Sequence, residues 1–140
     1  MFSKESRKAN RQILVDFIFN QLNSVNIPNK VKAFLLRSIH FHTPGAFFVL
    51  FLLLKFEIAI FCLIPLLTAF TLFFYFEGCF ITIVEYKLDQ ENHINIIDPY
   101  LYLYDIEIND DNRYKYTLFI SLIYFTVVGC VLTFKYNYNL

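Results

Sequence analysis

The sequence contains no tryptophan, only three cysteines, and long stretches without any charged side chain. The cysteines Cys62, Cys79 and Cys130 are odd in number and none follows another at the C-x-x-C spacing, which excludes a disulfide framework and a zinc ribbon. All three lie in or beside apolar segments, where cysteine behaves as a small apolar residue. We therefore predict that they are ordinary helix residues.

Charge is missing from two stretches that are long enough to cross a bilayer. Residues 58–76 form nineteen positions without an acid or base, and residues 117–134 form eighteen more. A helix needs about 20 apolar residues to cross roughly 30 Å of hydrocarbon. With 57% hydrophobic residues overall, the chain is predicted to be an all-α integral membrane protein.

The third span is predicted from a less regular segment. Residues 33–54 form either one helix kinked at Pro44 or a shallow hairpin, and we favour the single kinked helix because its length suffices to span. The next helix is expected to run without a break from Glu57 to Leu88. This gives an interfacial helix at residues 1–27 and a three-span membrane domain at residues 28–140, with an acidic loop at 89–112.

The first segment, residues 3–25, has the pattern of an amphipathic helix. Ser3 is a suitable N-cap. Such a helix either rests on the membrane surface or packs against a protein partner. The apolar face is predicted to contain Ile13, Leu14, Phe17, Ile18 and Leu22, with Lys4, Lys8, Arg11 and Asp16 mostly away from it.

The charges are separated along the chain. Residues 1–42 contain seven Lys or Arg, whereas the loop at 89–112 contains none. Three spans place the N-terminus and this loop on one side, which the excess of Lys and Arg predicts to be cytoplasmic. The basic segment suits anionic lipid headgroups, and no readout motif for nucleic acid accompanies it.

Five polar residues are the candidates for function. A carboxylate near the end of an apolar span is costly and often functional, which points to a proton or ion relay or to an interfacial carboxylate. His40 and His42 are two positions apart, so on a helix their side chains point about 200° apart and do not share a metal. We predict no metal and no cofactor. The candidate cluster is Glu77, Glu85, His40, His42 and Arg37.

Two resemblances follow from the residues. The segment Gly78 to Glu85 resembles a Cys-Pro-Leu-Thr-x-x-Glu signature of small, uncharacterised bacterial membrane proteins, with Cys79, Thr82 and Glu85 matching and Phe80 in place of the proline. The abundance of Phe, Tyr, Ile, Lys and Asn is similar to that of small multi-span membrane proteins of large AT-rich DNA viruses. Both resemblances imply a membrane protein, and neither implies an activity.

Enzyme and channel signatures are missing from the sequence. It contains no nucleophile elbow, P-loop, HExxH, kinase motif or potassium filter. The favoured interpretation is a non-catalytic structural or accessory component of a larger membrane assembly, with the lipid bilayer around it and protein partners at residues 1–25 and at the 89–112 loop. The alternatives are a small oligomeric channel that uses Glu77 and Glu85, and a membrane-embedded enzyme.

Overall fold

The computed structural model describes residues 3–91 and 94–138, and this part of the chain contains six helices and no strand. Three of the helices are long and apolar enough to cross a membrane, so the prediction of an all-α membrane protein with three spans is confirmed. In chain order the helices are α1 (Lys4–Asn23), α2 (Asn29–Leu53), α3 (Phe56–Phe76), α4 (Phe80–Leu88), α5 (Asp98–Leu103) and α6 (Asp110–Tyr138).

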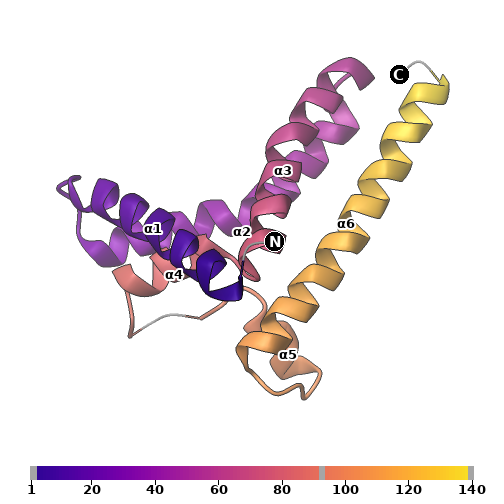
Figure 1. Ribbon diagram of the computed structural model, residues 1–140. Helices are drawn as coiled ribbons and strands as arrows, with labels where there is room; N and C mark the ends of the chain where they lie inside the picture. Colours follow the sequence, from indigo (N-terminus) through magenta and orange to yellow (C-terminus); the bar gives the residue numbers. More distant parts are fainter. Residues whose placement is uncertain (1–2, 92–93, 139–140) are drawn as a thin grey trace. The chain divides into compact units, whose positions relative to one another are not determined.

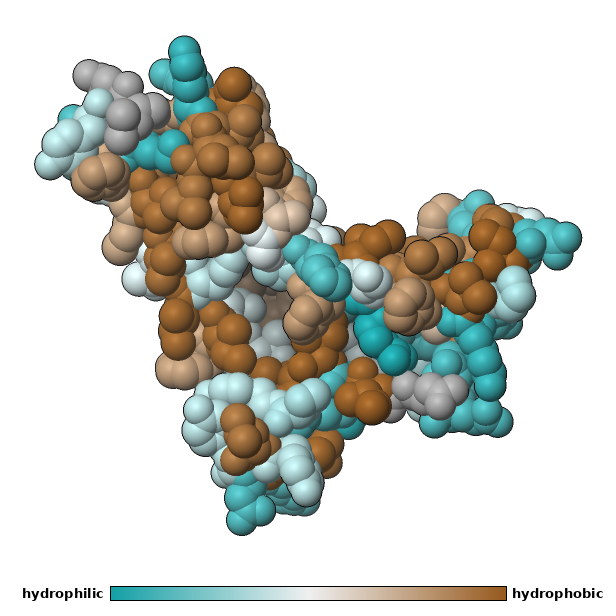
Figure 2. All heavy atoms as spheres, turned by 180° about the vertical axis from the view of Figure 1, so that it is seen from behind, coloured by the Kyte–Doolittle hydropathy of each residue, from teal (hydrophilic) through white to brown (hydrophobic). Residues whose placement is uncertain are grey.

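The three long helices bury little of their apolar surface inside the protein. The most apolar 18-residue windows of α2, α3 and α6 have mean hydropathies of 1.2, 2.3 and 2.2, and at most 11% of each window is buried. Figure 2 shows one face of the molecule, on which apolar side chains form large areas of the surface. Such a surface suits contact with lipid or with other apolar helices.

Helix α2 runs through Pro44 without a break, so the hairpin alternative is wrong. A proline inside a helix leaves one carbonyl of the preceding turn without its N–H donor, but the neighbouring turns still hold the helix together. The Tyr124 hydroxyl of α6 donates a hydrogen bond to the Pro44 carbonyl at 2.9 Å.

The predicted continuous helix from Glu57 to Leu88 is wrong, because the chain breaks between α3 and α4. Glu77 has φ 53° and Gly78 has φ 148°, and helical residues adopt neither value. The Gly78 N–H donates to the Phe73 carbonyl at 3.0 Å, which closes the end of α3 as in common helix C-caps. Glu77 and Glu85 therefore do not lie on one helix.

The chain divides into two compact units, which are described one at a time below. The first unit contains residues 1–41 and 72–96, and the second contains residues 42–71 and 97–140. Helices α2 and α3 each contribute residues to both units.

In the first unit, α1 packs along α4 (Figure 1). The N-cap prediction is confirmed, since the Ser3 hydroxyl accepts the Ser6 N–H at 3.2 Å. The predicted apolar face is partly wrong, because Ile13 and Phe17 are 68% and 61% exposed. The core instead contains Val15, Ala33, Val84 and Leu88, with Ile18, Phe19, Leu22, Leu36, Phe80 and Ile83 packed around them.

In the second unit, parts of α2 and α3 pack with α6 around a small apolar core. The core residues are Phe51, Ala59, Val128 and Leu132. Lys135 of α6 is 8% exposed, and its ammonium donates to the carbonyl of Leu54, directly after α2, at 2.9 Å. A buried ammonium thus joins the last turns of α6 to the connection between α2 and α3.

We predict that Gly78→Ala destabilises the protein by about 1–3 kcal/mol, because a side chain is strained at this backbone angle. Gly129→Ala is the matched control, since an added Cβ there meets nothing within 4 Å. The measurement is the temperature at which the detergent-solubilised protein loses its monodisperse state. Equal temperatures for both variants would contradict the account of the α3–α4 break.

Candidate functional site

A buried carboxylate organises the polar residues of the first unit. Glu85 of α4 is only 1% exposed. Its Oε1 lies 3.1 Å from the His40 Nδ1, and its Oε2 lies 3.5 Å from the Arg37 Nε. His40 and Arg37 are three positions apart on α2 and so share a face of that helix. A buried carboxylate is tolerated only with such partners, since an unpaired one is very costly.

Cys79 completes the cluster on the other side of the imidazole. It is the N-cap residue of α4, and its Sγ lies 3.5 Å from the His40 Nε2. The imidazole of His40 therefore contacts a carboxylate through one ring nitrogen and a thiol through the other. We name Cys79, His40 and Glu85 the thiol cluster.

The thiol cluster is arranged for proton transfer. With Glu85 ionised, the His40 Nδ1–H donates to it, which leaves Nε2 to accept the thiol proton. Burial raises the pKa of the Cys79 thiol, but the hydrogen bond and charge of His40 outweigh it, so the pKa lies below its usual value. The N–H and hydroxyl of Thr82 act in the same direction, as does the N-terminus of α4.

Sequence reasoning treated Cys79 as an apolar helix residue and missed it. The contact with His40 joins residues that are 39 positions apart, so no local pattern shows it. The one local signal was Gly78, because a helix that ends there makes Cys79 the start of the next helix. The residues of the bacterial signature, Cys79, Thr82 and Glu85, all lie at the cap or in the helix that follows.

Glu77 has partners of its own and does not contact the residues that hold Glu85. Its Oε1 lies 2.7 Å from the Arg7 Nη2, and its Oε2 lies 3.5 Å from the Lys4 Nζ. Arg11 donates a hydrogen bond of 3.2 Å to the carbonyl of Phe76, the last residue of α3. Three cations of α1 thus surround the C-terminal end of α3, where the helix dipole favours positive charge.

The structure therefore divides the five candidate residues. It brings Arg37, His40 and Glu85 together, places Glu77 on cations of α1, and assigns His42 to the second unit. A relay through Glu77 and Glu85 gains no support, since the two carboxylates contact different basic residues.

Two further ion pairs lie within the first unit. Lys30 lies 3.3 Å from Glu91, and Lys87 of α4 binds Asp16 of α1. The hydrogen bond from Lys87 holds the pKa of Asp16 below its usual value. Much of the basic charge that suits lipid headgroups in the sequence is thus paired within the first unit.

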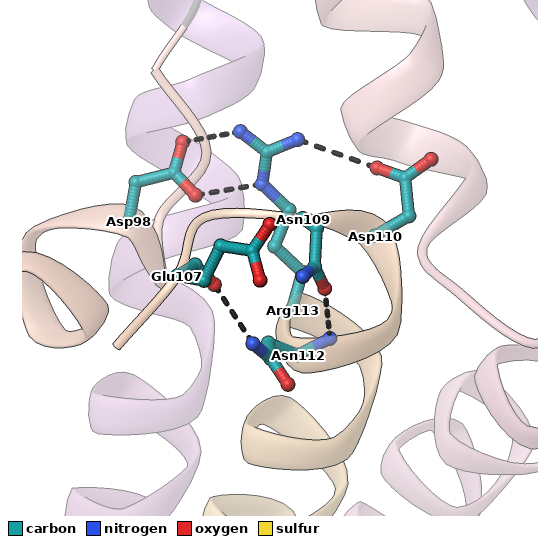
Figure 3. A network of polar contacts seen from close by, with 6 residues as sticks. All are labelled: Asp98, Glu107, Asn109, Asp110, Asn112 and Arg113. Carbon is teal, nitrogen blue, oxygen red and sulfur yellow. Dashed lines mark hydrogen bonds and ion pairs between the residues drawn. The ribbon is translucent and has the colours of Figure 1, made fainter.

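In the second unit, a polar network fixes the segment that leads into α6 (Figure 3). The Arg113 guanidinium binds Asp98 in a fork, with Nε–Oδ1 2.7 Å and Nη2–Oδ2 2.9 Å, and its Nη1 lies 3.3 Å from Asp110. The Asn109 side chain accepts the Asn112 N–H at 2.9 Å and so caps α6. Pro99 lies in the first turn of α5, a position that suits proline.

Within residues 3–91 and 94–138, no group of three or more His, Cys, Asp or Glu side chains is placed to hold a metal. Comparison with known proteins finds no matching family model, no matching curated protein and no matching solved structure.

We predict that Glu85→Gln lowers the free energy of unfolding by roughly 3 kcal/mol, because it leaves the partly buried Arg37 guanidinium and the His40 N–H without their carboxylate. Glu91→Gln is the control, since its pair with Lys30 is exposed and such pairs contribute about 0–1 kcal/mol. Thermal inactivation in detergent measures both. If Glu85→Gln inactivates at the same temperature as Glu91→Gln, the Glu85 carboxylate is not paired with Arg37 and His40 as described.

We predict that Arg113→Lys loosens the segment before α6, because an ammonium keeps the charge but not the fork to Asp98. The measurement is the rate of limited proteolysis between residues 98 and 112, which should rise several-fold. Lys115→Gln, at an exposed pair with Asp111, should leave the rate unchanged. An unchanged rate in Arg113→Lys would contradict a structural role for the fork.

Proposed function

We propose that the protein is a non-catalytic structural or accessory component of a larger membrane assembly and docks on a protein partner through the outer side of α1. The observation that carries the proposal is the pair of apolar side chains on that side. Ile13 and Phe17 are one helical turn apart and are 68% and 61% exposed.

Helix α1 is attached to the first unit by its opposite side. Val15 is fully buried there, and Ile18, Phe19 and Leu22 pack against the same core. Since the core uses one side of the helix, the side chains of Ile13 and Phe17 contribute little to the packing of the unit. Two large apolar residues at i and i+4 are the usual anchors of a helix that binds in a groove of another protein.

The charges of α1 favour a protein partner over a lipid surface. A helix that rests on a membrane carries Lys and Arg beside its apolar face. In α1, three of the four basic side chains, Lys4, Arg7 and Arg11, instead contact Glu77 and the carbonyl of Phe76. By helical spacing, none of the positions three or four residues from Ile13 or Phe17 is Lys or Arg; these positions are Ala9, Asn10, Leu14, Asp16, Asn20 and Gln21.

The orientation is part of the proposal. The basic N-terminal segment and the 89–112 loop lie on the cytoplasmic side, because Lys and Arg flanking the spans accumulate there. Lys55 and Lys135, at the other ends of the spans, would face the opposite side.

The test is substitution of the two outer residues of α1, Ile13→Ser with Phe17→Ser. Deletion of the whole helix would be ambiguous, because it would also uncover Val84 and Leu88. Native mass spectrometry of the protein, extracted gently from its source membrane, should show wild type bound to other subunits in fixed stoichiometry. The double variant should lose them while keeping its thermal stability.

The matched control is Gln12→Ser with Asn23→Ser, which changes two exposed residues on another side of α1. It should keep the bound subunits. A wild-type protein that carries only copies of itself, or a double variant that still binds other subunits, would refute docking through α1.

A further inference from the structure

We propose that Cys79 is an acyl-acceptor site: its thiol attacks the carbonyl carbon of a fatty acyl thioester, with His40 as the base and Glu85 as the positioning residue. The inference goes beyond the accessory role and does not depend on it. It rests on the geometry of the thiol cluster, on the position of Cys79 in the chain and on the cations near it.

The geometry is that of an activated thiol. A nucleophile within reach of a base, with the base oriented by a third group, is the arrangement by which proteins activate cysteine for acyl transfer. Here Nε2 of His40 lies 3.5 Å from the sulfur, and Nδ1 lies 3.1 Å from Glu85. Arg37 lies 3.5 Å from the other carboxylate oxygen, which holds Glu85 in place.

The start of α4 suits the charge that develops during attack. The first turn of a helix leaves backbone N–H groups without acceptors inside the helix. Cys79 is the cap of this turn in an extended conformation, φ −81° and ψ 117°, and α4 continues for nine residues. A carbonyl under attack by the sulfur can therefore place its oxygen near these N–H groups, as in other acyl-transfer sites.

The surroundings indicate the class of substrate. Cys79 follows Phe76, the last residue of the membrane-spanning helix α3, by three positions, and the rings of Phe76 and Phe80 lie 6.3 Å apart. An acyl chain in the bilayer would reach the protein at such a helix end. The Arg11 Nη1 lies 3.4 Å from the point that a Cβ on Gly78 would occupy, so a cation adjoins the residue before the thiol. A thioester with an apolar chain and a phosphate-bearing carrier matches both features.

The step balances without an oxidant or a reductant. The Cys79 thiol gives its proton to Nε2 of His40, and the sulfur forms a bond to the carbonyl carbon. The bond between that carbon and the carrier sulfur breaks, and the carrier thiolate takes the proton from His40. The products are a thioester on Cys79 and a free carrier thiol.

The experiment uses the full chain in phosphatidylcholine liposomes with palmitoyl-coenzyme A as the probe. Intact mass and peptide mapping should show one palmitoyl group, on Cys79 and removable by hydroxylamine. Cys62 and Cys130, in the same molecule, serve as internal controls and should react much more slowly. Acetyl-coenzyme A, which has the same carrier and no long chain, should react more slowly than the palmitoyl probe.

The variant His40→Asn should slow acylation of Cys79 by about 100-fold or more, as expected for loss of a general base. Cys62→Ser should leave it unchanged. Equal modification of the three cysteines, or a rate at Cys79 that His40→Asn does not change, would overturn the proposal.

A second measurement needs no variant and so does not depend on the folding of one. The rate of iodoacetamide alkylation of each cysteine is followed against pH. The Cys79 sulfur contacts His40 of α2 and Thr82 of α4. Glu85 contacts the other nitrogen of His40, and Arg11 of α1 lies beside Gly78. The rate at Cys79 should begin to fall at a lower pH than the rates at Cys62 and Cys130, since an ordinary thiol loses about tenfold in rate per pH unit below its pKa. A profile equal to those of Cys62 and Cys130 would overturn the site, and rapid alkylation without palmitoylation would overturn the acyl substrate.

Discussion

The carboxylate of Glu85 is buried, and the arrangement of the first unit follows from what that requires. An ion removed from water must be compensated by nearby charge and hydrogen bonds. Here the compensation comes from His40 and Arg37, two residues on one face of α2 that lie more than forty positions away in the sequence. The need to satisfy Glu85 therefore fixes the register of α4 against α2. Cys79 is placed against the second nitrogen of the same imidazole by that register.

The break before α4 makes this arrangement possible, and α1 covers it. A helix that continued through Gly78 would send residues 80–88 onward along the axis of α3. The positive backbone angles at Glu77 and Gly78 end α3, and the cations of α1 then bind both the Glu77 side chain and the last carbonyl of α3. Since Lys4, Arg7 and Arg11 serve this purpose, the outer side of α1 is left with Ile13 and Phe17. The proposed docking surface is thus a consequence of how cations of α1 bind the end of α3.

Local patterns predicted part of this fold correctly. The charge-free stretches predicted the membrane spans and Ser3 predicted the start of α1, because each depends on residues close together in the chain. The end of α3 was also encoded locally, by Gly78, but the apolar residues 80–84 after it suggested a continuing helix.

The missed features depend on distant residues. Val15 and Phe19 face the core in place of Ile13 and Phe17, because α4 selects which side of α1 it contacts. Neither the partners of Glu77 on α1 nor the contact of Cys79 with His40 follows from spacing along the sequence. For the same reason Glu77 and Glu85, which spacing placed on one helix face, belong to different ion-pair groups.

The most direct test of the thiol cluster is a double-mutant cycle between His40 and Glu85, read as the alkylation rate of Cys79 at pH 6. If Glu85 acts on the thiol only through the imidazole, His40→Asn and Glu85→Gln each slow the reaction, and the double variant is no slower than His40→Asn alone. Effects that add across the two positions would mean that Glu85 and His40 act on Cys79 independently, and would contradict the cluster as the structure presents it.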